Sequence, residues 1–561
     1  MNDTGGALLA ARRLVSGLLQ QGLAGAVVSP GSRNAPLMQA FRDAGVHHVV
    51  SLDERAAAHH ALGMALALGR PVAVCCTSGT AAINHGPALA EADRVGLPLI
   101  SLTADRPAGA AEQWESQTLE QNRLHDLHVR ASFTWTGADE DGMLDRMRTA
   151  LTAGPIHINC PFDEPLYPAA SERPDAQTPG LGASDSAAAD GAASALPQPV
   201  LDRLEQALSN QARILLLCGT QPLPLDAARL EGWTRSAVVA ADSTSGMGAV
   251  NQTIVAVDRW MRRWTASGIP WEDMKPDLVI GFGAPLLSKS LRQQLRKAAV
   301  DHIHIEAGGR FPTAFGSAPL GVAMPVPDAL YALSDRLAKQ PPSDPVKAWQ
   351  WRWRHLDAKA DAAHGPAVKA APWSDLQVHA ALHQAMPGDW DVHLANSTPV
   401  RYAQLFHRPD RTPPWSNRGV AGIDGCTSTA VGAALAGHRT TLITGDLGFL
   451  YDANAFHVHP LPAELRVAVI HNGGGGVFRW LDGPQRTGLL ESHFEMRHGL
   501  ELRSVCDLHG LEHQRVTSLD ALREALADWW SPSDVPRVLE IATPPEASAE
   551  AHRAYMEAVS A

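Results

Sequence analysis

The feature that most constrains the fold of this chain is a repeated unit. In each copy a short apolar run leads into a polar or glycine-rich turn and then into a helical stretch. The first copy is AGAVVSPGSRNAPL, which starts at Ala24, and the unit returns as HHVVSLDERAAAHHALG, PVAVCCTSGTAAINHG and PLISLTADRP. Apolar runs that alternate with helices are typical of parallel strands covered by helices on both faces. The sequence therefore predicts an α/β fold of doubly wound parallel sheets.

The length of the chain predicts more than one such sheet, because 561 residues exceed what a single hydrophobic core supports. Strand-like runs recur in a second region (ARILLLCG, SAVVAAD, PDLVIGFG, DHIHIEAG) and again in a third region. A stretch rich in Ala, Ser, Pro, Gly and Asp separates the first two regions and predicts a mobile linker. A charged, Trp-bearing segment before the third predicts a connecting helix. We therefore expect α/β domains at 1–172, 199–345 and 372–561, a linker at 173–198 and a helix at 346–371.

Composition narrows the class of protein. Apolar residues make up 45% of the chain and charged residues 19%, as in ordinary soluble proteins, and no apolar segment reaches membrane-spanning length. The N-terminus has no signal-peptide layout. Six cysteines without C-x-x-C pairing or zinc-ligand spacing favour reduced thiols in the cytosol. Since the net charge of −12 argues against nucleic acid, we expect a cytoplasmic protein whose partners are neither nucleic acid nor membrane.

The stretch from Gly445 to Phe478 carries the clearest candidate site. Its first apolar run ends in Gly-Asp, which puts the carboxylate of Asp446 at the carboxyl end of a strand, where open α/β sheets bind ligands. The next run, RVAVI, leads to Asn472 and four glycines. The carboxylate oxygen of Asp446, the amide oxygen of Asn472 and a backbone carbonyl oxygen of the glycine run suit Mg²⁺. Proteins usually hold this ion with one or two protein oxygens plus the phosphates of a bound ligand. The alternatives are a glycine loop in an ordinary α/β domain and a dinucleotide site, although the loop lacks the full G-x-G-x-x-G frame.

Gly-Asp, followed by Asn and then by a glycine two residues later, resembles the fingerprint of thiamin diphosphate enzymes. The resemblance implies that Mg²⁺, with Mn²⁺ as a substitute, is held by Asp446, Asn472 and the carbonyl of Gly474 and bridges to the diphosphate. It further implies cofactor contacts from the neighbouring residues Gly445, Leu447 and Gly475. The chain departs from the pattern in three ways. Relatives carry a small residue after Gly-Asp and two consecutive Asn later, whereas this chain has Leu447 and His471, and its spacer is one residue short.

The motifs SPGSRNAPL, DERAAAHHALG, CTSGTAA and LTADRP narrow the resemblance. Together with Asn-Arg-Gly and Gly-Ile-Asp-Gly in the third region, they closely resemble the 2-succinyl-5-enolpyruvyl-6-hydroxy-3-cyclohexene-1-carboxylate synthase family, thiamin diphosphate-dependent carboligases (transferases) of menaquinone biosynthesis. Matching motifs run from residue 29 to residue 478. The resemblance implies three domains of the thiamin enzyme type. It also implies decarboxylation of 2-oxoglutarate and addition of the resulting succinyl semialdehyde carbanion to isochorismate.

The resemblance also assigns roles to single residues. Glu54, at the family's position in DER, would hydrogen-bond the aminopyrimidine of the cofactor and favour its imino tautomer; from the residues alone it would be a helix N-terminal charge. Ile423 would hold the cofactor bent. Both substrates are dianions, for which Arg offers bidentate donors. The implied substrate contacts are Ser32, Arg33, Arg106, Gln117, Lys289, Ser397, Arg401, Arg418 and Phe478. Some relatives have Lys-Arg where this chain has Lys289 and Ser290, which leaves open whether Arg292 substitutes.

Other functions remain open at this stage. A different thiamin enzyme, such as a 2-oxo acid decarboxylase or an acetohydroxyacid-type synthase, would keep Glu54, Asp446 and Asn472 but would not need four arginines. A nicotinamide-linked oxidoreductase would need a dinucleotide loop that the sequence lacks, and a catalytically inactive binding protein would fit His471 and the short spacer. The resemblance implies a homodimer, or a dimer of dimers (homotetramer), in which Glu54 of one subunit meets Asp446 of the other.

Overall fold

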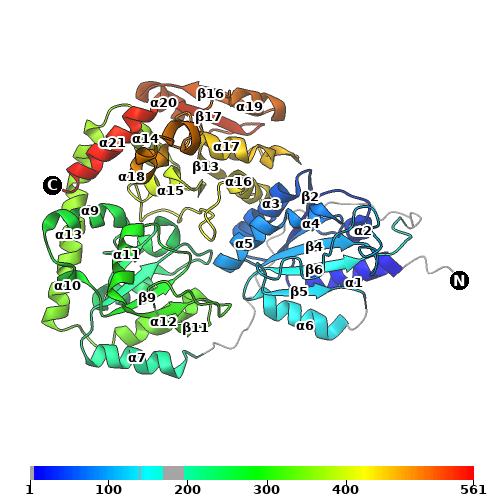
Figure 1. Ribbon diagram of the computed structural model, residues 1–561, viewed down its shortest axis with the longest axis horizontal. Coiled ribbons are helices and arrows are strands. Elements are labelled where there is room, and N and C mark those ends of the chain that lie inside the picture. Colours follow the sequence, from blue (N-terminus) through cyan, green and yellow to red (C-terminus); the bar gives the residue numbers. More distant parts are fainter. Residues whose placement is uncertain (1–5, 138–139, 168–194, 317) are drawn as a thin grey trace.

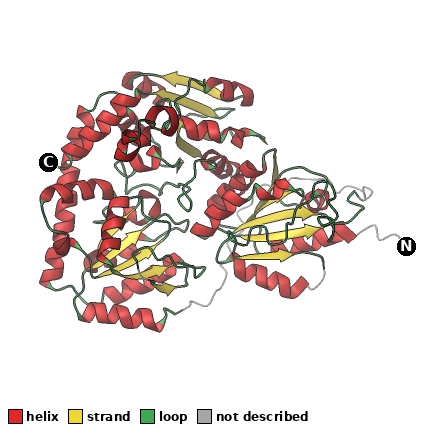
Figure 2. Ribbon diagram, viewed as in Figure 1, coloured by secondary structure: helices red, strands yellow, loops and turns green. Residues whose placement is uncertain are grey.

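The computed structural model arranges the chain as three α/β domains, each built on one largely parallel sheet (Figure 1). It describes residues 6–137, 140–167, 195–316 and 318–561. Helices lie on both faces of the strands, which confirms the predicted fold class (Figure 2). The strands are mostly buried, as expected for parallel sheets that are covered on both faces. Most of the predicted linker at 173–198 lies outside the described residues.

The first sheet has the strand order β14-β2-β1-β3-β4-β6-β5 and is parallel except at β14. Its strands are β1 (Gly25–Val28), β2 (His48–Ser51), β3 (Val72–Cys76), β4 (Leu99–Asp105), β5 (Ala131–Thr134), β6 (Ile156–Pro161) and β14 (Val458–His459). The helices of this domain are α1 (Gly6–Gln20), α2 (Ala35–Asp43), α3 (Glu54–Leu68), α4 (Thr80–Ile83), α5 (Gly86–Val95) and α6 (Glu140–Leu151).

Strand β14 comes from the third domain and not from the first. Val458 pairs with Ser51 of β2 in antiparallel register, and the Leu52 N–H donates to the His457 carbonyl at 3.1 Å. β14 therefore covers the edge of the first sheet beside the turn that leads to Glu54. The sequence does not predict this pairing, because a two-residue strand has no period to detect.

The first and third domains also meet through α3 and α16 (Cys426–Leu435), which lie side by side (Figure 1). Glycines let the two helices touch backbone to backbone. A Cβ on Gly63 would lie 2.0 Å from the Thr429 carbonyl oxygen, and a Cβ on Gly432 would lie 2.1 Å from that of His60. Larger residues at either glycine would force the helices apart, so this contact fixes the start of α3 relative to the third domain.

The middle domain has the strand order β11-β10-β9-β7-β8, all parallel. Its elements are α7 (Gln198–Ser209), β7 (Ile214–Cys218), α8 (Ala227–Ser236), β8 (Val238–Ala241), α9 (Val257–Ser267), α10 (Trp271–Met274), β9 (Leu278–Phe282), α11 (Lys289–Ala298), β10 (Asp301–Ile305), β11 (Leu320–Val322) and α12 (Val326–Leu337). Helix α13 (Asp344–Ala370) then runs to the third domain (Figure 1). Its Trp353 stacks on Trp260 with ring centroids 3.9 Å apart, so the Trp-bearing segment is a packing surface.

The third sheet has the strand order β12-β13-β15-β17-β16, all parallel. Its elements besides α16 are α14 (Asp375–Ala385), β12 (Asp391–Leu394), α15 (Thr398–Ala403), β13 (Thr440–Gly445), α17 (Asp446–Tyr451), β15 (Leu465–His471), the 3-10 turn η4 (Gly476–Trp480), α18 (Asp482–Arg486), α19 (Arg503–His509), β16 (Glu512–Val516), α20 (Leu519–Leu526), β17 (Arg537–Ala542) and α21 (Pro545–Ala558). Because β13 and β15 are neighbours, the residues that follow them lie at one edge of the sheet. No helix in the described part of the chain is long and apolar enough to cross a membrane.

Candidate active site

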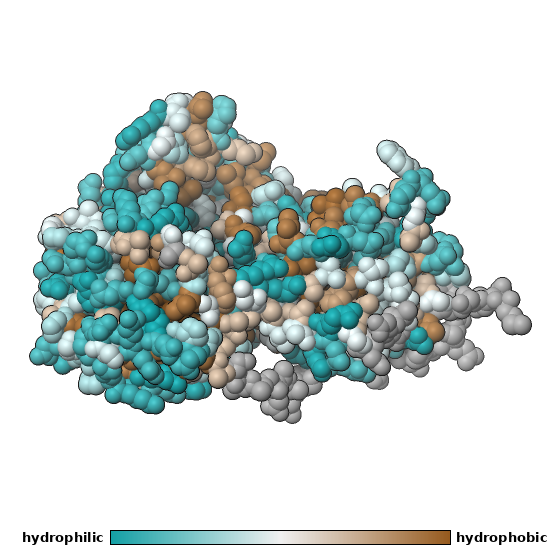
Figure 3. All heavy atoms as spheres, turned by 60° about the horizontal axis from the view of Figure 1, so that its bottom comes forward, coloured by the Kyte–Doolittle hydropathy of each residue, from teal (hydrophilic) through white to brown (hydrophobic). Residues whose placement is uncertain are grey.

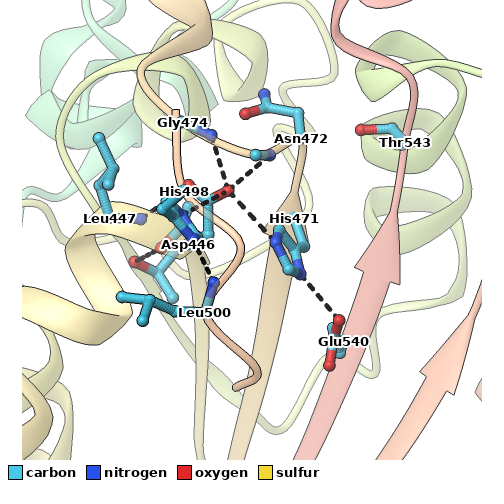
Figure 4. Close-up of polar contacts among 12 residues, drawn as sticks. Asp446, Leu447, His471, Asn472, Gly474, His498, Leu500, Glu540 and Thr543 are labelled. Atoms are coloured by element: carbon cyan, nitrogen blue, oxygen red, sulfur yellow. Dashed lines mark hydrogen bonds and ion pairs between the residues drawn. The ribbon is translucent and has the colours of Figure 1, made fainter. Parts of the chain in front are cut away.

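The Asp446 carboxylate is enclosed by the glycine loop that follows the neighbouring strand (Figure 4). Asp446 is 1% exposed and begins α17 directly after β13. Its Oδ1 accepts the Leu447 N–H at 2.7 Å, and its Oδ2 accepts the N–H groups of Gly473 and Gly474 at 2.7 and 3.0 Å. Burial raises the pKa of Asp446, although the positive field of His471 and the backbone donors oppose the rise. A bound cation would favour the ionised carboxylate.

Asn472, which directly follows the neighbouring strand β15, carries an unpaired side-chain oxygen. Its Nδ2 donates to Asp375 Oδ2 at 3.0 Å, whereas its Oδ1 is buried and has no hydrogen-bond partner in the described structure. Asp375 is itself held by the hydroxyls of Thr543 and Ser548, at 2.6 and 3.0 Å. The amide is therefore fixed with its oxygen free, and an oxygen orphaned in this way fits a hard cation such as Mg²⁺.

The backbone of the glycine loop needs its glycines. Gly473 and Gly474 have φ of +81° and +152°, and a Cβ on Gly474 would lie 2.4 Å from the Glu495 carbonyl oxygen. The Gly474 carbonyl accepts the Gly476 N–H at 3.0 Å and keeps a second lone pair for another partner. Gly475 donates to the same Glu495 carbonyl at 2.7 Å, so the segment around Glu495 closes over the loop.

Glu54 does not cap the helix that it begins. Asp53 is the N-cap of α3, since its Oδ1 accepts the N–H groups of Arg55 and Ala56 at 2.8 and 3.2 Å. Among the described residues the Glu54 carboxylate has no hydrogen-bond or ion-pair partner. Burial raises the pKa of Cys76 at the end of β3, and the negative charge of Glu54 adds to the rise, so the carboxylate lies near the carboxyl ends of β2 and β3. An unpaired carboxylate there is available to a ligand.

A group of arginines lies where the third and middle domains meet. Arg418 Nη1 donates to Asn396 Oδ1 at 2.7 Å, and Arg401 Nη1 donates to the Ser397 carbonyl at 2.5 Å. Burial lowers the pKa of both arginines, and the positive charge of Arg292 lowers each further. Guanidinium groups held this close favour binding of a carboxylate. Ser397 has φ of +77°, a strained value for a non-glycine residue and one often found at functional sites.

Helix α11 of the middle domain carries both Lys289 and Arg292, and Arg292 is the one that interacts electrostatically with this group. Lys289 is exposed at the first position of the helix, whereas Arg292, one turn later, is half-buried. Burial lowers the pKa of Arg292 while the negative charge of Asp242 raises it.

The arginines of the first domain form a separate group. Arg33 is 9% exposed, donates to the Phe162 carbonyl at 3.0 Å and pairs with Glu164 at 3.4 Å. Arg106 follows β4 and pairs with Glu115 at 2.9 Å. Ser32 and Gln117 are exposed in nearby loops.

Within the described chain, no hydrogen bond or ion pair joins a candidate residue of the first domain to one of the other two domains. We call the two groups of candidates half-sites: one contains Glu54 and the other contains Asp446.

Two apolar candidates border the second half-site. Ile423 is half-exposed in the loop before α16, so it is not a core residue. Phe478 lies in η4, and its ring centroid is 5.6 Å from that of Phe494.

The sequence pattern did not single out His498, which lies 3.5 Å from Asp446 through its Nε2. It is separated from Asp446 by 52 positions, and no local spacing indicates the contact. The sequence pattern also gave no role to Glu540 on β17, which accepts a hydrogen bond from His471 at 2.8 Å.

Known proteins share both the domain signature and the full length of this chain. The family described as "Thiamine pyrophosphate enzyme, N-terminal TPP binding domain" matches residues 9–124. A 2-succinyl-5-enolpyruvyl-6-hydroxy-3-cyclohexene-1-carboxylate synthase of Porphyromonas gingivalis is 34% identical over 96% of this chain and 95% of its own length. Proteins of the same name from Cytophaga hutchinsonii and Geobacillus kaustophilus are 32% and 33% identical, over 97% and 90% of this chain and 97% and 89% of theirs.

Proposed function

This chain belongs to the 2-succinyl-5-enolpyruvyl-6-hydroxy-3-cyclohexene-1-carboxylate synthase family, and we propose that it carries out the family's reaction with thiamin diphosphate and Mg²⁺ bound between two subunits. The enzyme is a transferase that decarboxylates 2-oxoglutarate and joins the remaining four-carbon unit to isochorismate in menaquinone biosynthesis. Bound thiamin diphosphate supplies the carbon nucleophile that captures the 2-oxo acid. The protein's own residues bind, orient and polarise the reactants.

The proposed metal site rests on Asp446, Asn472 and the Gly474 carbonyl. The buried carboxylate and the orphaned amide oxygen are hard ligands at one strand edge, and the fixed Asp375 contact orients the amide. Mg²⁺ is the expected ion and Mn²⁺ a substitute, and the neighbouring Gly445, Leu447 and Gly475 would line the diphosphate.

The proposed activation of the cofactor rests on Glu54. Its carboxylate is unpaired because Asp53 caps the helix, so it is available to hydrogen-bond the aminopyrimidine nitrogen of the cofactor. Ile423 would support the bent cofactor from below.

The proposed binding of the substrates rests on the two groups of arginines. Arg401, Arg418 and Arg292 offer several guanidinium donors to dianions, and Arg33 and Arg106 offer further ones from the first domain. A simple 2-oxo acid decarboxylase does not need this concentration of positive charge. The arginine group therefore favours the carboligase over that alternative.

The two half-sites favour assembly across a subunit interface. Hydrophobic side chains near Glu54 are unusually exposed, with Leu52 at 66%, Val50 at 49% and Tyr451 at 56%. On the face shown in Figure 3, hydrophobic residues also form patches within a largely hydrophilic surface. Exposed apolar groups of this kind suit contact with a second copy, so we infer a homodimer or a dimer of dimers.

We place the enzyme in the cytoplasm, because all six cysteines are buried free thiols, as is usual in reducing compartments.

The observation that carries the proposal is that a buried Asp446 carboxylate and an orphaned Asn472 oxygen follow neighbouring strands in a chain of this family. The test is to supply purified protein with thiamin diphosphate and Mg²⁺ and to measure carbon dioxide release from 2-oxoglutarate, with and without isochorismate. We expect release that depends on the cofactor and a joined product, identified by mass spectrometry, when isochorismate is present. Preference for pyruvate, or no joined product, would contradict the proposal.

A further inference from the structure

His471 lies next to the proposed metal ligand Asp446, with one ring nitrogen on the side of its carboxylate. Its Nε2 lies 3.9 Å from Asp446 Oδ2, and its Nδ1 lies 2.8 Å from Glu540 Oε1 on the neighbouring strand β17 (Figure 4). Its side chain is only 15% exposed.

Glu540 fixes which nitrogen of His471 faces the site. Glu540 also contacts His513 Nε2 at 2.8 Å and Arg515 Nε at 3.1 Å. An ionised carboxylate can only accept, so His471 Nδ1 carries a proton and donates it to Glu540. In the neutral ring the lone pair is then on Nε2, on the side of Asp446. Metal-binding histidines are typically held in this way, with the second nitrogen donating to a carboxylate.

His498 approaches the same carboxylate in the opposite tautomer. Its Nδ1 accepts the Leu500 N–H at 3.3 Å, so in the neutral ring the proton is on Nε2. That Nε2 is buried, has no hydrogen-bond partner in the described structure and lies 3.5 Å from Asp446 Oδ2. His498 is therefore placed to donate a proton to an anionic ligand, whereas His471 is placed to offer a lone pair.

Potential ligand atoms of two kinds, oxygen and nitrogen, are found at this edge of the sheet. Asp446 offers a carboxylate oxygen, Asn472 an orphaned amide oxygen and His471 a ring nitrogen; the potential ligand atoms of Asp446, His471 and His498 lie within 4.8 Å of one another. Mg²⁺ prefers oxygen ligands, whereas Mn²⁺ and Co²⁺ accept imidazole more readily.

We propose that His471 Nε2 is a direct ligand of the divalent cation, together with Asp446 and Asn472, and that the site consequently favours Mn²⁺ and Co²⁺ over Mg²⁺. This inference rests on the proposed function, because it assumes a cation at Asp446. It assigns Glu540 as the residue that holds His471 in position.

The test uses Mn²⁺ with inorganic diphosphate, which fills the diphosphate position and contains no nitrogen. Electron spin echo measurements on the full-length protein should detect ¹⁴N coupling from a directly bound imidazole. The coupling should disappear in His471→Asn, which keeps a polar side chain but removes the imidazole. Protein labelled with ¹⁵N at histidine should change the signal accordingly. His513→Asn is the matched control, because it removes the other histidine on Glu540 and should leave the coupling in place.

Affinities give a second readout. His471→Asn should weaken Mn²⁺ binding about tenfold or more relative to Mg²⁺, and Glu540→Gln should weaken Mn²⁺ binding about 10- to 100-fold, as for other groups that orient a ligand. Wild-type protein without ¹⁴N coupling, or coupling that persists in His471→Asn, would overturn the inference. Asp446→Ala distinguishes failure of the proposed metal site from failure of the proposed role of His471. If it abolishes Mn²⁺ binding and wild type shows no nitrogen coupling, only the role of His471 is wrong; if it leaves Mn²⁺ binding intact, the metal site itself is wrong.

Discussion

At the scale of single residues, Asp53 and Glu54 are adjacent carboxylates with separate roles. Asp53 is bound by the two N–H groups that it caps, and by Asn454 Nδ2 at 2.7 Å. Glu54 has no such partner in the described structure. The helix start therefore has its stabilising charge from Asp53, and the Glu54 carboxylate stays available for another partner.

We expect Glu54→Gln to keep the affinity for thiamin diphosphate but to lose turnover by about 100-fold or more, because an amide cannot share a proton with the ring nitrogen. Calorimetry and steady-state kinetics measure the two effects. Asp53→Ala is the control: it should lower the free energy of unfolding by about 1 kcal/mol through the lost cap while folded protein keeps its turnover. Normal turnover in Glu54→Gln would remove Glu54 from the mechanism.

Arg401 gives a second prediction at this scale. Arg401→Ala should raise the KM for a carboxylate substrate, with little change in cofactor affinity, since breaking a buried charge pair costs about 2 to 5 kcal/mol. Arg401→Lys should recover only part of the loss, because a lysine cannot bind a carboxylate in bidentate fashion. Arg408→Ala, at a surface arginine that pairs with Asp410, serves as the control. Unchanged kinetics for both substrates in Arg401→Ala would return Arg401 to a structural role.

At the scale of elements, α5 holds the loop that carries Arg418. Glu91 on α5 is 1% exposed and accepts the N–H groups of Gly419 and Val420 at 2.7 and 2.8 Å. Burial raises the pKa of Glu91 to about 7, although these donors and Arg418 oppose the rise. The first domain thus sets the position of the third-domain loop that carries Arg418.

The raised pKa predicts a pH effect on stability. Because the folded protein binds this proton more tightly than the unfolded chain, the contribution of Glu91 is greatest below its unfolded pKa of 4.5 and is lost as the pH rises through about 7. In urea unfolding, the free energy of unfolding of wild type should therefore fall relative to that of Glu91→Gln as the pH rises from about 5 to about 8. Glu524→Gln, at an exposed glutamate of α20, should show no such trend. A difference between wild type and Glu91→Gln that is independent of pH would contradict the role of Glu91.

At the scale of the whole molecule, we expect a second chain to complete each half-site. We expect Glu54→Gln and Asp446→Ala chains, each inactive alone, to regain activity when they are co-expressed. In a mixed dimer one site combines both lesions, whereas the other has an intact Glu54 and an intact Asp446. A two-fold interface repeats every contact, so about half of the sites in mixed dimers should be active. Differential affinity tags would isolate the mixed dimers, and their inactivity would mean that each site is built within one chain.

The sequence alone determined the elements whose signals are local. The strand runs and turns predicted three α/β domains, and Gly-Asp and Asn-Gly predicted which strand ends carry polar oxygens, because side-chain period and turn chemistry are set by near neighbours. The family motifs identified Glu54, but the sequence did not show that Asp53 would take the capping role.

Only the tertiary structure decided which distant groups meet. It paired β14 with β2, brought His498 to Asp446 and Glu540 to His471, and put Arg292 within electrostatic reach of Arg401 and Arg418. These contacts join segments that are tens to hundreds of residues apart. They depend on helix packing and sheet order, which no local pattern of residues encodes.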